Sequence, residues 1–346
     1  MNIVTIIKNS KLIIVAVLFL GIFLKLNLLP QSSLANNTEK ANIDKNLVDF
    51  CNIFNAKIKQ YNWNKIVCNP KTWQWDKKYI TPKGNPLVYQ AFLHNPTSST
   101  TLILCGVHGD ELPSSYQCIH LVRDIVFDNP ALYKNSNVVI APLVNPDGFF
   151  AAKPTRQNSN GIDLNRNFPT KDFDLSAIVD WKKDGKSNPR KYPGSKGGSE
   201  IETQFQVMLL DKFHPDKIIS IHSPYGWLDI DATPKEDPSM DEPEGMQFGP
   251  FKSLFETANA LGKEMSKKSN NFPIANFRVF PGSLGNYAAN ERRIPTYTVE
   301  LKTSSAFHAD SYWKIMRSAY IAAIKYKIPK ELAKKREDLS TSTTQN

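Results

Sequence analysis

Short apolar runs alternate along this chain with longer amphipathic segments. The apolar runs are of strand length and are bounded by turn residues, which predicts buried strands at 87–93, 101–105, 138–144, 218–222 and 296–301. One amphipathic segment places its apolar residues on a single helical face, at Leu112, Tyr116, Ile119 and Val126. Asp310 stands where it would cap a long final helix that ends before Pro329. Strands that alternate with helices predict an α/β fold with a single mixed sheet flanked by helices.

The N-terminus predicts an export signal. Lys8 and Lys11 precede the apolar run 12–24, which has the length of a signal h-region and is short for a membrane span. Residues 33–35, Ser-Leu-Ala, then offer a small-x-small cleavage site. We therefore expect residues 1–35 to be a signal peptide or, alternatively, an uncleaved N-terminal membrane anchor.

Two polar insertions interrupt the predicted alternation of strands and helices. Residues 171–198 are rich in Lys, Gly and Pro, and residues 229–250 are acidic and contain four prolines. Both patterns predict surface loops, the part of a fold where binding residues are often found.

The chain contains four cysteines, which could form disulfides if the protein is exported. Export would carry them into an oxidising environment, where pairs can close. We predict a disulfide between Cys51 and Cys68, in a segment whose pattern indicates irregular structure. Cys105 and Cys118 fall in a strand-like and a helix-like segment, where two buried thiols are as good an interpretation as a disulfide.

Composition excludes several classes of protein. A chain with 41% apolar residues, 22% charged residues and a net charge of +10 is not a disordered, collagen-like or multi-pass membrane protein. The positive charge would suit nucleic acid, an anionic membrane or an anionic cell wall. The basic residues are scattered and form no stripe, so we expect no nucleic-acid partner. The oligomeric state has no signature in the sequence.

Candidate chemistry begins where the predicted strand 101–105 ends. His108 and Glu111 lie three positions apart in a turn that enters a helix, so both can face one metal ion. A His-x-x-acid pair arises by chance in about one of two chains of this composition, so the pair alone is weak. Its place just past a strand strengthens it, because ligands of α/β sheets gather outside the carboxyl ends of strands. His222 ends a second strand, where a hydrogen-bonded core histidine is the ordinary alternative.

Further motifs follow in a fixed order along the chain. They are Asn145-Pro146-Asp147-Gly148, the run 161–168 that follows Arg156, Ser199-Glu200-Ile201-Glu202-Thr203 and Thr298-Val299-Glu300-Leu301. With the two histidine segments, they resemble the zinc metallocarboxypeptidase family typified by carboxypeptidase A, over about residues 86–326. The resemblance implies a zinc-dependent exopeptidase fold. It divides the mature chain into a lead-in segment 36–85, a catalytic domain 86–330 and a polar tail 331–346.

The resemblance implies a metal centre and a catalytic pair. His108, Glu111 and His222 would hold one Zn²⁺, the ligand set known for carboxypeptidase A. Glu300 would act as the general base for the attacking water. Arg156 would stabilise the oxyanion that develops on the scissile carbonyl.

The resemblance also implies how the substrate is held. Asn165 and Arg166 would bind the terminal carboxylate of a peptide, because a guanidinium offers two parallel donors to two carboxylate oxygens. Asp163 would face His108 and fix its tautomer, although an aspartate in such a turn often serves only the turn. Leu284 stands where the specificity-determining residue of the family falls.

The chain departs from the family pattern around the substrate. Digestive carboxypeptidases place a closing tyrosine before a Gly-Ser-x-Asp segment, whereas residues 276–281 contain no tyrosine and Gly285 replaces the aspartate. The apolar Leu284 argues against a simple preference for Lys or Arg side chains. A second cation for a substrate with an extra carboxylate, such as diaminopimelate, would come from Arg278, or from Arg292 and Arg293. Solvated surface arginines are the ordinary alternative.

Three functions are compatible with these residues. We expect a bacterial periplasmic or cell-envelope enzyme, similar to the murein peptide amidases and cell-shape peptidoglycan carboxypeptidases of the family, that hydrolyses a bond near the C-terminus of peptidoglycan stem peptides. The alternative is a secreted carboxypeptidase for ordinary peptides with apolar C-terminal residues. A non-catalytic peptide- or wall-binding protein on the same fold is a third possibility, but binding alone does not need a base such as Glu300 beside a metal.

Overall fold

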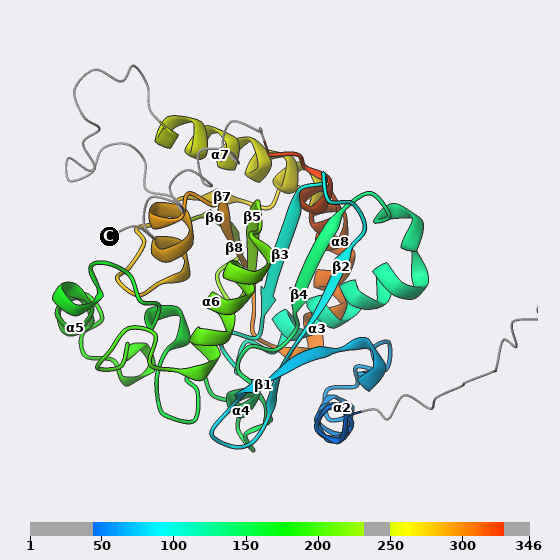
Figure 1. The fold of residues 1–346 in the computed structure, drawn as a ribbon, viewed down its shortest axis with the longest axis horizontal. Coiled ribbons are helices and arrows are strands. Elements are labelled where there is room, and N and C mark those ends of the chain that lie inside the picture. Colours follow the sequence, from blue (N-terminus) through cyan, green and yellow to red (C-terminus); the bar gives the residue numbers. More distant parts are fainter. Residues whose placement is uncertain (1–43, 232–249, 329–346) are drawn as a thin grey trace, which may run out of the picture. The chain divides into compact units, whose positions relative to one another are not determined.

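An eight-stranded sheet runs through the described part of the chain (Figure 1). The computed structural model describes residues 44–231 and 250–328. The strand order is β1 (Gln74–Ile80), β2 (Pro86–Leu93), β4 (Asn137–Ala141), β3 (Thr100–Cys105), β5 (Lys217–His222), β8 (Thr296–Glu300), β6 (Trp227–Ile230) and β7 (Ile274–Ala275).

The centre of the sheet is parallel and its flanks are antiparallel. Strands β4, β3, β5 and β8 run side by side in one direction, whereas β2 pairs antiparallel with β4, and β6 antiparallel with β8. The central strands β4 and β5 are buried along their whole length, which explains their continuous apolar runs. The five predicted strands are present to within a few residues. β1, β6 and β7 were not predicted, because β1 is largely exposed and the other two are short.

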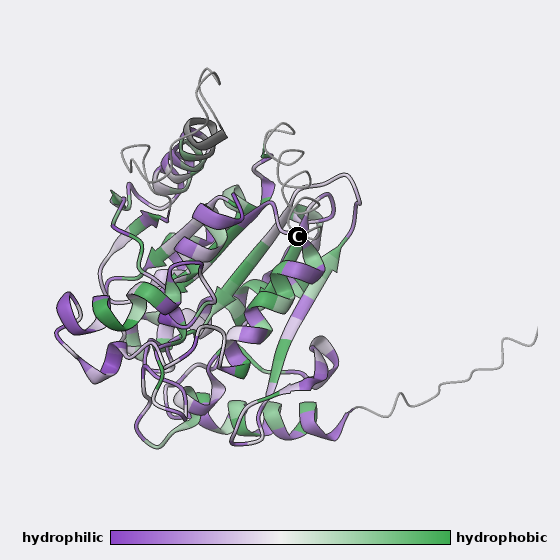
Figure 2. Ribbon diagram, turned by 60° about the vertical axis from the view of Figure 1, so that its left-hand side comes forward, coloured by the Kyte–Doolittle hydropathy of each residue, from purple (hydrophilic) through white to green (hydrophobic). Residues whose placement is uncertain are grey.

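Helices cover both faces of the sheet. One core lies between the sheet and the helices α2 (Lys45–Lys59), α3 (Leu112–Arg123), α7 (Pro250–Lys268) and α8 (Ala309–Lys325). The other core includes α6 (Ile201–Phe213) and the helical turn 285–291. Two further helices, α4 (Pro146–Phe150) and α5 (Phe173–Lys183), are short. In Figure 2 the central strands are largely hydrophobic and the outer turns of the helices hydrophilic, so the layered α/β architecture follows the predicted pattern.

Several local predictions were wrong. Residues 171–198 are not only loop, because Phe173 and Ala177 bury one side of α5. The segment around Cys51 is helical, since Cys51 lies in α2. Val126 is 37% exposed, because α3 continues into a wider π-helical turn at 124–128 that shifts the face. His308 rather than Asp310 caps α8.

Other predictions fall wholly or partly on residues that are not described. The export signal 1–35 and the tail 331–346 lie outside the described residues, and so does most of the insertion 229–250. Within 44–231 and 250–328, no helix is both long and apolar enough to cross a membrane.

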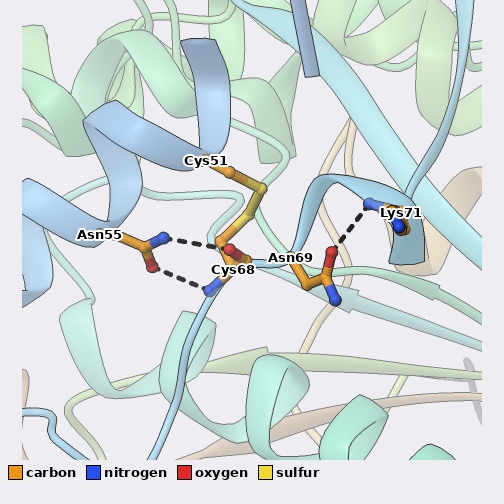
Figure 3. The surroundings of a disulfide bond; sticks show 5 residues. All are labelled: Cys51, Asn55, Cys68, Asn69 and Lys71. Atoms are coloured by element: carbon orange, nitrogen blue, oxygen red, sulfur yellow. Dashed lines mark hydrogen bonds between the residues drawn. A yellow bond between two sulfur atoms is a disulfide. The ribbon is translucent and has the colours of Figure 1, made fainter. Parts of the chain in front are cut away.

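The lead-in segment is attached to the catalytic core through α2. A disulfide joins Cys51 in α2 to Cys68, as predicted, and the Asn55 side chain makes two hydrogen bonds to the backbone of Cys68, at 3.0 and 2.8 Å (Figure 3). Phe50 and Phe54 of the same helix are buried against Phe149 and Phe150 of α4. Residues 44–72 therefore pack as part of the domain.

Removing the Cys51–Cys68 disulfide should lower stability without changing the fold. The bond closes a sequence separation of 17 residues, for which the chain-entropy model gives about 3 kcal/mol. We expect the double variant Cys51→Ser/Cys68→Ser to lose about that much free energy of unfolding in urea titrations followed by circular dichroism. An unchanged unfolding midpoint would show that the disulfide does not constrain the unfolded chain.

Candidate metal centre and active site

Three neighbouring parallel strands bring the candidate residues to one edge of the sheet. β3 ends at Cys105 just before His108, β5 ends at His222, and β8 ends at Glu300. Cys105 pairs with Ile221, and His222 pairs with Glu300. Because the carboxyl ends of parallel strands meet at the same edge, side chains distant in sequence converge there.

Glycines let the loop after β3 pack tightly. Gly106 has a φ of +60°, and a Cβ on it would lie 2.6 Å from the Ser115 hydroxyl oxygen. A Cβ on Gly109 would lie 2.4 Å from the backbone of Gly148 in α4. The loop that carries His108 is therefore pressed against the start of α4.

Three potential metal ligands meet at the end of this loop. Glu111 Oε1 lies 2.8 Å from His108 Nδ1, and Glu111 Oε2 lies 2.9 Å from His222 Nδ1. The two Nδ1 atoms are 3.0 Å apart. All three residues are at least 95% buried. The predicted set His108, Glu111 and His222 is thus brought together around a single point.

The hydrogen bonds of the Nε2 atoms of His108 and His222 determine whether their Nδ1 atoms carry a proton or a lone pair. His108 Nε2 lies 2.9 Å from Asp163 Oδ1, and His222 Nε2 lies 3.0 Å from the Ser220 hydroxyl. Burial alone would raise the pKa of Asp163, but Arg156 and His108 hold it well below its usual value. The ionised Asp163 therefore accepts a hydrogen bond from His108 Nε2–H. A neutral His108 ring protonated at Nε2 has its Nδ1 lone pair on the side of Glu111, where a cation would offset the repulsion between the lone pair and the carboxylate. An imidazole lone pair, a second imidazole and a carboxylate fit a zinc ion.

Arg156 lies beside these ligands. Its Nε donates to Asp163 Oδ2 at 2.9 Å, and a terminal nitrogen donates to Glu111 Oε1 at 3.2 Å. The side chain is 18% exposed, so the cation borders both the metal ligands and the open side of the site. This is a position from which a guanidinium can reach a developing negative charge.

The carboxyl group of Glu300 is largely shielded from solvent. Its Oε2 is buried and has no hydrogen-bond partner among the described residues. Burial, followed by the negative charge of Glu111, raises the pKa of Glu300 to about 8. A carboxyl held in this way suits proton transfer near neutral pH.

The proposed substrate residues lie on a short turn anchored by Asp163. Its carboxylate accepts from Asn165 N at 3.0 Å and caps the turn Leu164–Arg166. Asn165 Oδ1 in turn accepts from Leu284 N at 2.9 Å. Leu284 itself is 3% exposed and belongs to the core, so its backbone rather than a wide side-chain surface faces Asn165.

Arg278 and Arg292, two further arginines of the sequence argument, both form ion pairs with acids of the chain. Arg278 forms ion pairs with Asp180 and Asp184 of the α5 segment, and Arg292 forms an ion pair with Asp211. Arg292 is therefore a paired surface residue, whereas Arg278 also lines the cavity that contains Arg166.

Some residues of the site were not foreseen. Phe280 places its ring 4.2 Å from the Arg166 guanidinium, a cation–π contact that no pattern indicated. Ser220 could have been suspected, because it lies two positions before His222 on the same strand face. Cys105 and Cys118, left open above, form a disulfide that encloses both His108 and Glu111.

Comparison with known proteins identifies the family. Residues 71–318 match the zinc carboxypeptidase peptidase family M14, and the chain belongs to it. The fold and the enzyme class that the motifs predicted are thereby confirmed, and the family is zinc-dependent.

Relatives and solved structures agree with this assignment. The chain is 30% identical over 227 residues to the murein peptide amidase A of Vibrio campbellii, covering 64% of this chain and 77% of that protein. It is 34% identical over 163 residues to the murein peptide amidase A of Escherichia coli, covering 46% and 60%. The fold matches bovine thrombin-activatable fibrinolysis inhibitor with a TM-score of 0.58 at 19% identity, covering 84% of this chain and 97% of that one.

The His108, Glu111 and His222 cluster leads to a test by metal analysis. His222→Ala should lose stoichiometric zinc while keeping its circular dichroism spectrum, because a three-ligand catalytic site is not the fold's nucleus. His94→Ala, at an exposed histidine, is the matched control and should keep its zinc. Full zinc occupancy in purified His222→Ala would remove this residue from the ligand set.

Proposed function

We propose that this chain hydrolyses a peptide bond near the carboxyl end of peptidoglycan stem peptides. The observation that carries the catalytic part is the convergence of two histidines and Glu111 beside Arg156 and beside Glu300, whose Oε2 is buried. The murein substrate is supported by the two murein peptide amidases to which the chain is similar.

Each polar group of the site has a chemical task in this proposal. When zinc is bound, it polarises a carbonyl and makes a water molecule more acidic. Glu300 takes a proton from the attacking water and passes it to the leaving amine, which its raised pKa allows. Arg156 holds the carbonyl oxygen as negative charge develops on it. Asp163 keeps His108 and Arg156 in place through its two oxygens.

In this proposal Arg166 restricts hydrolysis to the carboxyl end of the substrate. Burial lowers the pKa of Arg166, and no carboxylate of the described residues forms an ion pair with its guanidinium, which therefore lacks direct charge compensation. A substrate carboxylate would supply that compensation and form a bidentate pair. The Asn165 side-chain amide lies on the same turn and would donate to the same carboxylate.

We also propose that the chain is exported before it acts. The predicted signal peptide at 1–35 and the two disulfides, Cys51–Cys68 and Cys105–Cys118, both suit an oxidising compartment. Sequencing the N-terminus of the protein isolated from its host distinguishes cleavage after Ala35 from an uncleaved anchor.

Glu300→Gln should separate catalysis from binding. The amide keeps the shape of the side chain but cannot accept a proton, so kcat should fall by about 10² to 10⁴ while zinc content is unchanged. The measurement is steady-state hydrolysis with zinc quantified in the same samples. Turnover close to that of the unmodified enzyme would exclude Glu300 as the base.

Arg166→Ala should reveal how the substrate terminus is read. We expect a loss in kcat/KM for free-acid peptides of about 1.5 to 3 kcal/mol, the range of a charge-assisted hydrogen bond. Amidating the substrate terminus should cost the wild-type enzyme a similar factor and cost the variant little. Equal losses from amidation in both proteins would show that Arg166 does not bind the carboxylate.

Parallel digestion of two substrate panels tests the substrate class. Purified peptidoglycan fragments and N-blocked dipeptides ending in Phe or Leu should be incubated with the enzyme and the products compared by mass. We expect muropeptides that end in a diamino acid to react faster. Hydrolysis of the Phe or Leu dipeptides with untouched muropeptides would favour the secreted carboxypeptidase for ordinary peptides.

A further inference from the structure

Two buried acids of the motif 199–203 have no task in the proposed mechanism. α6 begins at Ile201, so Glu200 and Glu202 stand at its N-terminal end. Glu202 is fully buried and Glu200 is 5% exposed. No Lys, Arg or His of the described residues forms an ion pair with either carboxyl group, and Glu202 Oε1 has no hydrogen-bond partner among them. Buried acids without a cation depend on hydrogen-bond donors.

One side-chain amide supplies a donor to both acids. Asn158 Nδ2 donates to Glu200 Oε2 at 2.7 Å and to Glu202 Oε2 at 3.1 Å. Asn158 is itself 5% exposed, so both hydrogen bonds are shielded from solvent. Burial raises the pKa of Glu202 to about 7, and the hydrogen bond from Asn158 acts in the opposite direction. The amide therefore offsets part of the cost of burying this carboxyl group.

The oxygen of the same amide closes a loop of the backbone. Asn158 Oδ1 accepts from the N–H groups of Asn160 and Ile162, at 3.1 Å each. The backbone N–H of Asn158 donates to Ile162 O at 3.1 Å, and Gly161, with a φ of +75°, turns the chain between them. Because the oxygen and the nitrogen of the amide have different partners, neither a flipped amide nor a carboxylate could make these four side-chain hydrogen bonds.

The closed loop lies between two residues of the active site. Arg156 stands two positions before Asn158, and Asp163 directly follows Ile162. The side chains on either side of the loop meet, since Arg156 Nε donates to Asp163 Oδ2 at 2.9 Å. Asp163 also faces His108 at 2.9 Å, so a shift of the loop would reach a proposed metal ligand.

We propose that Asn158 is a positioning residue of the active site. Its amide, held by the two acids of α6, closes the loop 158–162 and thereby fixes Asp163 beside Arg156. This role rests on the proposed function, in which Asp163 orients His108 and Arg156 stabilises the oxyanion. The acids of α6 therefore act on the active site through Asn158, without touching the reacting atoms.

Asn158→Asp tests this role, because it replaces the shared donor with a third carboxylate that faces two others. We expect the affinity for zinc, measured by competition with a chelator, to fall about 10-fold, as when an outer partner of a metal-binding histidine is lost. kcat should also fall, on whichever peptide the wild-type enzyme hydrolyses. Asn160→Asp is the matched control, because it makes the same chemical change in an exposed side chain that donates to Glu200 alone. This control should keep the wild-type affinity for zinc.

A second substitution should restore what Asn158→Asp removes. Glu202→Gln in the Asn158→Asp background supplies an amide N–H to the new carboxylate, so donor and acceptor are exchanged. We expect the double variant to recover most of the affinity for zinc. Glu202→Gln alone keeps a carbonyl oxygen for the Asn158 amide and should bind zinc as the wild-type enzyme does. A loss in Asn158→Asp without recovery in the double variant would overturn the proposed contact.

The results distinguish this role from the proposed function. If the wild-type enzyme binds zinc but hydrolyses no stem peptide, the proposed substrate is wrong, and the comparison of zinc affinities still decides the role of Asn158. A role in stability alone would lower the melting temperature of Asn158→Asp and leave zinc affinity and kcat unchanged, which would contradict the proposal. If Asn158→Asp does not fold, Asn158→Ser takes its place, because a hydroxyl adds no charge and cannot donate to both acids. Unchanged zinc affinity in Asn158→Ser would then overturn the proposal.

Discussion

The site depends on one buried carboxylate, that of Asp163. One oxygen faces His108 Nε2 and also accepts from Asn165 N, and the other accepts from Arg156 Nε. A single fully buried side chain therefore orients a proposed metal ligand, the cation beside it and the turn that carries Arg166. Because His108, Arg156 and the turn before Arg166 all bind the same carboxylate, Asp163 fixes the distances between them.

The parallel sheet supplies the rest of the alignment. His222 and Glu300 are paired residues at the ends of β5 and β8, so a shift of either strand by one residue would turn its side chain to the face opposite the other. The apolar residues of β3, β5 and β8, buried between two layers of helices, oppose such a shift. Packing far from the metal centre thus sets the geometry of its ligands.

Sequence patterns predicted those features of the structure that depend on neighbouring residues in the chain. The central strands have continuous apolar runs, and the His108, Glu111 and His222 motifs stand at their ends, so both were predictable. The contact of Phe280 with Arg166 was not, because the two residues are distant along the chain and meet only in the folded structure. The π-helical turn after α3 was missed for a similar reason, since helical periodicity assumes a constant turn.

The Cys105–Cys118 disulfide has a consequence for a protein that meets proteases. Both cysteines are fully buried, and the proposed metal ligands His108 and Glu111 lie between them in the chain. A single cut of the backbone anywhere from 106 to 117 would leave the two fragments covalently joined through sulfur. His108 and Glu111 would then each stay within a few residues of a cysteine that is anchored in the core.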